Sequence, residues 1–315
     1  MKAIQLTQFG GPEVMQYVEL SDPVPSANEV LIDVTAIGIN YADTHQTENS
    51  YLSPQTLPFI PGLEVTGIAD GKRVLAAVSG GGYAQKAIAN KAMTIAIPDQ
   101  VSDEQALCML VQGTTAWHIL KTVGHLKSGE SVVIHAAAGG VGSLAIQLAK
   151  MWGGKVIAVT SSDEKKKLAK ELGADEVIDA DVTNLKSEIL RANGGKPVDL
   201  VLEMVGGKTT DISLEVLAPF GRLIVYGAAS RSAAQVIHPT SLMGGSKTVT
   251  GFWLAHCFGN KALLNDVIEE LFKLTAQGKL KPIIGGTYPL SQATKAHQDM
   301  LSRITTGKIT LNPAI

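Results

Sequence analysis

The stretch that decides the fold spans residues 132–142, Val132-Val133-Ile134-His135-Ala136-Ala137-Ala138-Gly139-Gly140-Val141-Gly142. An apolar strand here enters a glycine-rich turn that opens a helix, in the pattern G-x-G-x-x-G with Ala137 in the first glycine position. The small residue at 137 allows the tight turn, the bare backbone at Gly139 can approach a pyrophosphate, and Gly142 lets the helix lie against the strand. The helix N-terminus adds unpaired N–H groups and a positive dipole end.

The same residues also fit a glycine-rich packing turn. The strand before the turn and the helix after it favour dinucleotide binding instead. We therefore expect the loop to bind the cofactor's phosphates through the following residues: Ala138, Gly139, Gly140, Val141 and Gly142.

Downstream of this loop, apolar runs alternate with charged segments of helical period, which is typical of βαβ units on a parallel sheet. Strands are expected at 131–136, 155–160, 176–178, 198–203, 222–226 and 248–252. Helices are expected between them, near 141–152, 164–172, 184–192 and 209–217. The predicted fold class is α/β, with a Rossmann doubly wound parallel sheet.

The two ends of the chain have a different texture. At about 150 residues per domain, 315 residues predict about two domains. The first hundred residues are strand-like and broken by turns, whereas 263–276 and 291–303 have helical period and 308–311 is a closing strand. We expect a mostly β domain at 1–115, a dinucleotide-binding domain at 116–257, and a return of 258–315 to the first domain.

Composition excludes several classes of protein. Hydrophobic residues make up 45% of the chain, which excludes intrinsic disorder, and a net charge of −2 favours neither nucleic acid nor a membrane surface as partner. Cys108 and Cys257 stand far apart without a C-x-x-C motif, so neither a disulfide framework nor a cysteine-built zinc knuckle is expected. With no signal peptide evident at the N-terminus, a reducing cytoplasmic setting fits best.

The end of the second expected strand bears on the choice of coenzyme. NAD-binding proteins of this class place a carboxylate there for the ribose 2′-hydroxyl, and this chain has Thr160. Ser161, Ser162 and Lys165 follow as hydrogen-bond donors and a cation for a 2′-phosphate. They also suit an ordinary helix N-cap and a solvated face. The missing acid favours NADPH.

Several further motifs occur in a fixed order along nearly the whole chain. They are Gly10-Gly11-Pro12-Glu13, Gly38-Ile39-Asn40-Tyr41-Ala42-Asp43-Thr44, the stretch 58–67, Gly82-Tyr83-Ala84-Gln85, Gln112-Gly113-Thr114-Thr115-Ala116, Gly173-Ala174 and Thr306-Gly307-Lys308. With the glycine-rich loop, they resemble the medium-chain dehydrogenase/reductase superfamily, and in particular its zinc-free quinone oxidoreductase branch, which includes zeta-crystallin. The resemblance implies a Rossmann domain inserted in a GroES-like, mostly β domain.

The resemblance also bears on metal. Zinc-dependent members that this chain resembles have a cysteine where Asn40 stands and a histidine where Leu63 stands. Asparagine and leucine cannot supply the thiolate and imidazole of such a site. We expect no metal, and hence hydride transfer to an acceptor that is already electrophilic.

By resemblance, Asn40 hydrogen-bonds near the nicotinamide ribose and Tyr51 faces the substrate, where its hydroxyl could donate to the acceptor oxygen. A structural interpretation of Tyr51, as a loop aromatic, is nearly as well supported. Family members often have a tyrosine where this chain has His45, which could deliver a proton near neutral pH or could be a plain surface residue.

Other cofactor contacts follow from the resemblance. They are Thr115 near the phosphates or nicotinamide, Gly227 after the fifth strand, Phe252 and Trp253 near the nicotinamide amide, and Arg303 near the 2′-phosphate. Relatives place a tyrosine against that phosphate near position 180, where this chain has Ala180. This departure weakens the case for NADPH.

The expected function is NADPH-dependent hydride transfer to a quinone. The alternatives are a reductase of enoyl or 2-alkenal substrates and a non-catalytic NADPH-binding protein with a structural or regulatory role. Relatives commonly dimerise through the last Rossmann strand, here 248–254, so we expect a homodimer.

Overall fold

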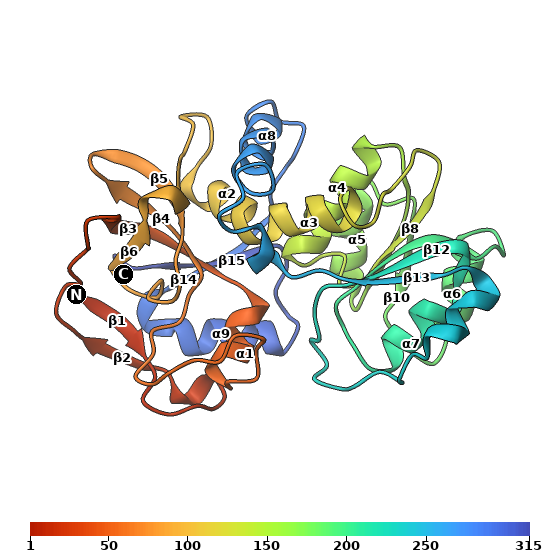
Figure 1. Cartoon of the computed structure of the whole chain (residues 1–315), viewed down its shortest axis with the longest axis horizontal. Helices are drawn as coiled ribbons and strands as arrows, with labels where there is room; N and C mark the ends of the chain where they lie inside the picture. Colours follow the sequence, from red (N-terminus) through yellow and green to blue (C-terminus); the bar gives the residue numbers. More distant parts are fainter. The chain divides into compact units, whose positions relative to one another are not determined.

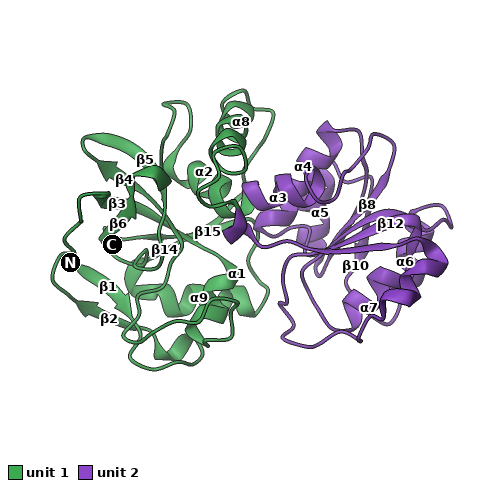
Figure 2. Cartoon of the chain, in the orientation of Figure 1, with its two compact units in different colours: residues 1–112, 257–315 green, residues 113–256 purple.

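The computed structural model describes all residues from 1 to 315, and its internal contacts divide the chain into two units (Figure 2). Unit 1 consists of residues 1–112 and 257–315, and unit 2 of residues 113–256. Both chain termini therefore belong to unit 1. The domain boundaries expected from the sequence, after residues 115 and 257, remain predictions. The division into units falls after residues 112 and 256. No helix has the length and apolar character needed to cross a bilayer.

Unit 2 is built on a six-stranded sheet in the order β10-β9-β8-β11-β12-β13, and all its strand pairs are parallel. The strands are β8 (Ser131–Ile134), β9 (Lys155–Thr160), β10 (Glu176–Asp179), β11 (Val198–Glu203), β12 (Leu217–Val225) and β13 (Thr248–Gly251). The chain starts in the middle at β8, moves outward to β10, and returns across β8 to β11. This reversal is the topological switch point of a doubly wound sheet, so the predicted fold class is confirmed.

Helices connect these strands and cover both faces of the sheet (Figure 1). The unit 2 helices are α3 (Thr114–Leu120), α4 (Gly140–Met151), α5 (Asp163–Glu171), α6 (Leu185–Ala192) and α7 (Lys208–Glu215). Right-handed crossovers place α4 and α5 on one face and α6 and α7 on the other. The sheet is buried from both sides, which is why its central strands contain continuous apolar runs such as 132–134.

Unit 1 contains a seven-stranded sheet with the path β14-β15-β3-β4-β5-β7, on which β6 also pairs with β3, and a separate hairpin of β1 and β2. Its strands are β1 (Lys2–Gln5), β2 (Gln16–Glu19), β3 (Glu29–Ile39), β4 (Glu64–Ala69), β5 (Lys72–Ala77), β6 (Lys86–Asn90), β7 (Thr94–Ala96), β14 (Ile284–Pro289) and β15 (Lys308–Asn312). β15 runs antiparallel to β3, with Ile309 opposite Ile39. The C-terminal segment therefore returns to the first part of the chain, as predicted.

Short helices complete unit 1: α1 (Tyr41–Thr47), α2 (Asp103–Cys108), α8 (Asn265–Ala276) and α9 (Ala293–Leu301). Its hydrophobic core joins residues far apart in the sequence, for example Ile37 of β3, Tyr83, and Leu311 of β15. The apolar side chains alternate along β3, because one face of this antiparallel sheet covers the core.

Two expected strand ends in unit 2 differ from the structure by more than one residue. β8 stops at Ile134 instead of residue 136, because Ala136 has φ of +48° and already belongs to the turn. β12 begins at Leu217, where a helix end was expected, because α7 stops at Glu215. Helices α2 and α3, with a π-helical turn at Met109–Gly113 between them, were not among the predicted elements.

Candidate active site

The glycine-rich loop lies between β8 and α4 in the centre of the unit 2 sheet. Gly139 is the N-cap of α4, and its backbone N–H donates to the carbonyl of Ala136 over 2.9 Å. A Cβ added at Gly139 would meet a single neighbour, the Ala136 carbonyl oxygen at 3.1 Å. A Cβ at Gly142 would lie 2.5 Å from that same oxygen and 2.6 Å from the Cα of Ala137. Gly142 therefore serves packing, whereas the bare backbone at Gly139 leaves space of the kind a pyrophosphate needs.

The end of β9 is the second part of this carboxyl edge. Thr160 is 3% exposed, and its hydroxyl oxygen Oγ1 has no hydrogen-bond partner within the protein. A buried hydroxyl without a partner costs free energy unless a ligand or water satisfies it. Its position at the end of the second strand is where dinucleotide-binding proteins contact the adenosine ribose. The protein's own residues thus fit a dinucleotide here.

The residues after β9 have roles in the helix that follows. Ser162 is the N-cap of α5, and its hydroxyl accepts a hydrogen bond of 3.4 Å from the backbone N–H of Lys165. Lys166 forms ion pairs of 2.9 Å with Asp179 and 3.3 Å with Asp163. Ser161 is exposed at the start of this turn. Ser162 is therefore confirmed as a helix N-cap. That Ser162 and Lys165 also bind the cofactor remains a prediction.

The end of β11, next to β8 at the switch point, is shaped by Glu203. This carboxylate is fully buried and accepts hydrogen bonds from the backbone of Val205 at 2.6 Å and Gly206 at 3.1 Å, and from the Thr210 hydroxyl at 2.6 Å. These bonds hold the loop between β11 and α7 at the edge of the sheet where ligands bind. Sequence reasoning missed Glu203; an acid at the end of an otherwise apolar strand was the available signal.

The ends of β12 and β13 complete the edge. Gly227 follows β12, and a Cβ there would lie 3.0 Å from the Cβ of Met204 in the loop after β11. Phe252 follows β13, donates its backbone N–H to Val225 over 2.9 Å, and packs its ring 5.6 Å from that of His118. Trp253 packs edge-on to His256 at 5.3 Å. Thr115 is buried near the start of α3.

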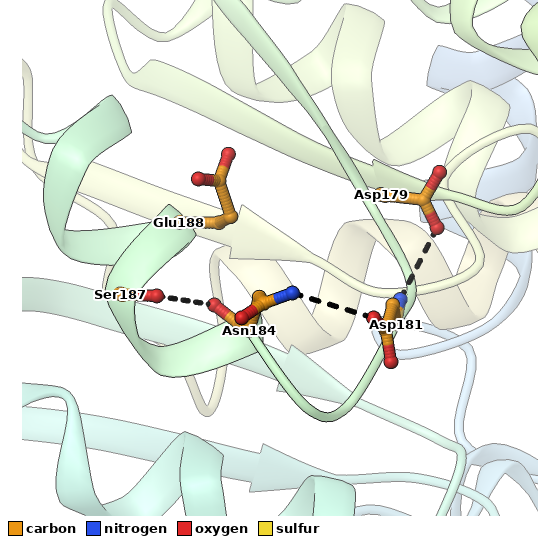
Figure 3. Close-up of a pocket in the computed structure, with 5 residues that line it drawn as sticks. All are labelled: Asp179, Asp181, Asn184, Ser187 and Glu188. Atoms are coloured by element: carbon orange, nitrogen blue, oxygen red, sulfur yellow. Dashed lines mark hydrogen bonds between the residues drawn. The ribbon is translucent and has the colours of Figure 1, made fainter.

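A separate acidic pocket lies at the end of β10 and the start of α6 (Figure 3). It is lined by Asp179, Asp181, Asn184, Ser187 and Glu188. The Asn184 amide donates to Asp181 over 3.5 Å, and the Ser187 hydroxyl donates to the Asn184 carbonyl over 2.8 Å. Three carboxyl groups in one pocket disfavour a phosphate, so this pocket is no candidate for the cofactor's phosphates.

In unit 1, Asn40 lies where β3 ends and α1 begins. Its side chain is 4% exposed, its amide Nδ2 donates to Glu64 Oε1 over 2.8 Å, and its Oδ1 accepts from Lys308 Nζ over 3.0 Å. Lys308 also forms an ion pair with Glu64, and both side chains are fully buried. Asn40 is thus held between a cation and an anion. Glu64 and Lys308 are further residues that sequence reasoning did not assign a role.

Asn40 also takes part in a second buried hydrogen-bond network, which contains Asp43, Tyr83 and His297. The backbone N–H of Asn40 and the hydroxyl of Tyr83 both donate to Asp43 Oδ2, over 2.8 and 2.9 Å, and Tyr83 lies 2.9 Å from His297 Nε2. Burial raises the pKa of the Asp43 carboxyl to about 7, although these two hydrogen bonds lower it. Burial lowers the pKa of His297 to about 4. Asp43 therefore changes protonation near neutral pH while His297 stays neutral there.

Tyr51 follows α1 in a loop and is half-buried. Its ring stacks with that of His45 at 6.3 Å, and His45 Nδ1 lies 3.1 Å from the Ser50 hydroxyl. The structure therefore brings Tyr51 and His45 together. Arg303 lies after α9 with φ of +58°. The roles of Asn40, Tyr51 and Arg303 toward substrate or cofactor remain predictions.

The donor set around Asn40 does not resemble a zinc site. No group of three or more histidine, cysteine, aspartate or glutamate side chains lies close enough together anywhere in the structure to hold a metal ion. The carboxylate that contacts the Asn40 side chain, Glu64, is engaged by the ammonium of Lys308, so a cation already occupies the space next to it. Thiolate and imidazole ligands are missing from this position.

A doubly wound sheet with a glycine-rich loop, inserted in the sequence of a mostly β unit to which the chain returns, defines a dinucleotide-dependent dehydrogenase of the medium-chain type. The family model described as alcohol dehydrogenase GroES-like domain matches residues 26–99, and that described as zinc-binding dehydrogenase matches residues 140–276. The chain is 33% identical to the quinone oxidoreductase of Pseudomonas aeruginosa, with 99% of each chain covered. The chain therefore belongs to the quinone oxidoreductase family of medium-chain dehydrogenases/reductases.

Solved structures agree with this assignment. A mycobacterial protein determined in complex with NADPH is 36% identical, with a TM-score of 0.94 over 99% of this chain and 100% of that one. The quinone oxidoreductase of Escherichia coli, also complexed with NADPH, is 32% identical, with a TM-score of 0.93 over the same shares. The predicted family and the GroES-like and Rossmann fold are thereby confirmed.

Proposed function

We propose that the protein is an NADPH-dependent quinone oxidoreductase that works without zinc. The observation that carries this is the combination of full-length similarity to quinone oxidoreductases with a glycine-rich loop in which a Cβ at Gly139 would meet one neighbour, the Ala136 carbonyl oxygen at 3.1 Å. Two structural relatives were determined with NADPH bound. The zinc-free part is supported by Asn40, and by the Lys308 ammonium beside Glu64, at the position where zinc members have ligands.

In the proposed reaction, bound NADPH supplies a hydride, the quinone takes that hydride with a proton, and hydroquinone and NADP⁺ are released. The backbone from Ala138 to Gly142 and the N-terminus of α4 bind the pyrophosphate. Ser162 and Lys165 bind the 2′-phosphate, with Arg303. The buried Thr160 hydroxyl donates to the adenosine ribose, which satisfies an atom that has no partner in the protein.

At the reacting end, Asn40 hydrogen-bonds the nicotinamide ribose, and Gly227, Phe252 and Trp253 line the nicotinamide. The Tyr51 hydroxyl donates to the acceptor oxygen, where negative charge develops during hydride transfer. The ring of His45 stacks on that of Tyr51, with 6.3 Å between the ring centroids. A conjugated carbonyl would use the same groups, so the acceptor class is decided by the experiment below.

We also propose a cytoplasmic homodimer. Strand β13 pairs only with β12, which makes it an edge of the six-stranded sheet whose backbone groups can pair with a second chain. Two free, buried cysteines suit a reducing compartment. Light scattering after size-exclusion chromatography tests the dimer. A Val249→Pro variant removes an N–H that faces away from β12, because the Phe252 N–H, at an odd separation of three residues, bonds to Val225 of β12, and this variant is expected to elute as a monomer.

The experiment that tests the function follows coenzyme oxidation by the purified protein with a para-quinone or a 2-alkenal, using NADPH and NADH in parallel. Rapid NADPH oxidation with the quinone supports the proposal. Oxidation with the alkenal alone makes the protein a reductase of conjugated double bonds. Tight NADPH binding without turnover of either acceptor indicates a non-catalytic role, and turnover that prefers NADH contradicts the coenzyme assignment.

A further inference from the structure

The side-chain amide of Asn40 is held in one orientation by two opposite charges. Its oxygen Oδ1 faces the Lys308 ammonium at 3.0 Å, and its nitrogen Nδ2 faces Glu64 Oε1 at 2.8 Å. Turning the amide over would set its NH₂ group against the ammonium and its oxygen against the carboxylate. Both contacts would become repulsive, so the orientation follows from the charges themselves.

The two charged groups are in turn held by the backbone. Lys308 Nζ donates to the Ile39 carbonyl over 3.2 Å, in addition to Asn40 Oδ1 and Glu64. An ammonium has three N–H donors, and all three are used. Glu64 Oε2 accepts the backbone N–H of Val111 over 3.0 Å. Neither ion has freedom to move away from Asn40.

The sheet is built to accept this ion pair. β15 pairs with β3 so that Ile309 lies opposite Ile39, which brings the neighbouring Lys308 to the start of α1. Glu64 lies opposite Gly38 in the pairing of β3 with β4. A Cβ at Gly38 would lie 2.6 Å from Glu64 Oε1 and 2.7 Å from its Cγ. The absence of a side chain at Gly38 is therefore what allows Glu64 to reach Asn40.

Stability alone does not explain such an arrangement. A fully buried ion pair contributes little net stability compared with apolar residues of the same size, because both ions lose their hydration. What it provides is one defined arrangement of polar groups. After its bond to Glu64, the Asn40 amide keeps one N–H in a fixed direction.

We propose that Lys308 and Glu64 are positioning residues that orient the Asn40 amide toward the nicotinamide ribose of the bound cofactor. This inference rests on the proposed function, in which Asn40 contacts that ribose. Neither charge touches the cofactor or the acceptor in this scheme. Both act through Asn40.

The test replaces both charges at once, in a Lys308→Met/Glu64→Gln variant, so that no buried charge is left unpaired. Loss of a fixed hydrogen bond to the ribose is expected to weaken NADPH binding about tenfold. Adenosine 2′,5′-bisphosphate, which has no nicotinamide ribose, is expected to bind the variant as it binds the unchanged protein. The fluorescence emission of bound NADPH is expected to shift toward that of free NADPH.

A mutant cycle with Asn40 separates positioning from a structural role. In an Asn40→Ala background, the Lys308→Met/Glu64→Gln change is expected to have no further effect on NADPH affinity, because the residue through which it acts is gone. An Arg73→Met/Asp103→Asn variant is the matched control. It removes another ion pair of unit 1, with Arg73 Nη2 and Asp103 Oδ1 2.6 Å apart, and should leave NADPH affinity unchanged.

The inference is overturned if the double variant binds NADPH as tightly as the unchanged protein, if both ligands weaken equally, or if the effect persists in the Asn40→Ala background. If Lys308→Met/Glu64→Gln does not fold, Lys308→Gln/Glu64→Gln, which keeps hydrogen-bonding groups, undergoes the same measurements. Failure of the proposed function looks different, because the unchanged protein itself would then not bind NADPH, and the inference would fall with it. An unchanged protein that binds NADPH without turnover still tests the positioning role.

Discussion

The hydroxyl of Tyr83 donates a 2.9 Å hydrogen bond to Asp43 Oδ2, and both side chains are fully buried. Asp43 Oδ2 also accepts the backbone N–H of Asn40, so this carboxyl group supports the residue at the end of β3. The other oxygen of Asp43, Oδ1, has no partner within the protein. Tyr83 is the side chain that donates a hydrogen bond to this acid, and the charge of Lys308 also favours its ionised form.

Tyr83→Phe is expected to destabilise the protein by about 1–3 kcal/mol, because it leaves a buried acceptor with one donor fewer. It also raises the pKa of Asp43 further, since the lost hydrogen bond favoured the ionised form. Urea unfolding at pH 8 measures the change. Tyr17→Phe, at an exposed tyrosine on β2, is the control and should change stability by less than about 0.5 kcal/mol. Equal stability of the two variants would contradict the prediction.

The glycine-rich loop offers a matched pair of substitutions. Gly139→Ala places its Cβ 3.1 Å from a single atom, the Ala136 carbonyl oxygen, so it should cost less stability than Gly142→Ala. NADPH affinity is expected to fall at least about tenfold, because the pyrophosphate loses its space. Gly142→Ala brings its Cβ to 2.5 Å from a backbone oxygen and is expected to destabilise unit 2 by about 1–3 kcal/mol. Thermal unfolding and titration with NADPH distinguish the two effects. Loss of stability in Gly139→Ala with NADPH affinity retained would reverse this assignment.

Local pattern was enough to predict the unit 2 sheet. The strands 155–160 and 198–203 have the bounds that their apolar runs predict, because each run is ended by a polar turn or helix start. Since parallel strands end at one edge, the loops carrying Gly139, Ser162 and Gly227 could be placed at a common edge from sequence alone. The fold of unit 2 therefore follows from hydrophobic patterns that repeat every few residues along the sequence.

The surroundings of Asn40 could not be predicted in the same way. Lys308 reaches Asn40 only through the pairing of β15 with β3, across 268 positions of sequence, and no local period encodes that pairing. From the sequence, Lys308 is merely a lysine in a Thr-Gly-Lys motif and Glu64 an acid before an apolar strand. The lack of a partner for the Thr160 hydroxyl is likewise a property of packing that residue types do not show.

Coenzyme choice gives a third prediction. Lys165→Met is expected to raise KM for NADPH about tenfold and to leave KM for NADH unchanged, because a lysine on a phosphate forms a charge-assisted contact that NADH cannot use. Lys167→Met is the control, since Lys167 is exposed two residues further along α5. Steady-state kinetics with both coenzymes measure the effect. A parallel rise of both KM values would indicate a structural effect on α5 instead.

Stability below neutral pH is expected to depend on His135. Burial lowers the pKa of His135 to about 4, and its Nε2 lies 3.0 Å from the Ser213 hydroxyl. The unfolded chain takes up a proton near pH 6.5 while the folded protein does not. The contribution of neutral His135 is thus complete above pH 6.5 and is lost as the pH falls toward 4.

In His135→Gln, the decrease in the free energy of unfolding between pH 6.5 and pH 4 should be smaller by about 2–3 kcal/mol than in the unchanged protein. Urea unfolding at a series of pH values measures this slope. Asp43 acts in the opposite direction: its raised pKa makes the folded state bind a proton as the pH falls through 7, which adds stability toward pH 4. An unchanged slope in His135→Gln would mean that His135 is protonated within the fold.

Tyr51 tests the acceptor end of the proposed site. If its hydroxyl donates to the acceptor oxygen, Tyr51→Phe is expected to lower kcat for a para-quinone about tenfold or more while leaving the NADPH affinity unchanged. The ring that stacks on His45 at 6.3 Å is retained in this variant, so packing of the loop is conserved. Tyr17→Phe serves again as the control. Full activity of Tyr51→Phe would leave Tyr51 a packing residue and make His45 the next candidate, to be examined as His45→Phe through the pH dependence of kcat.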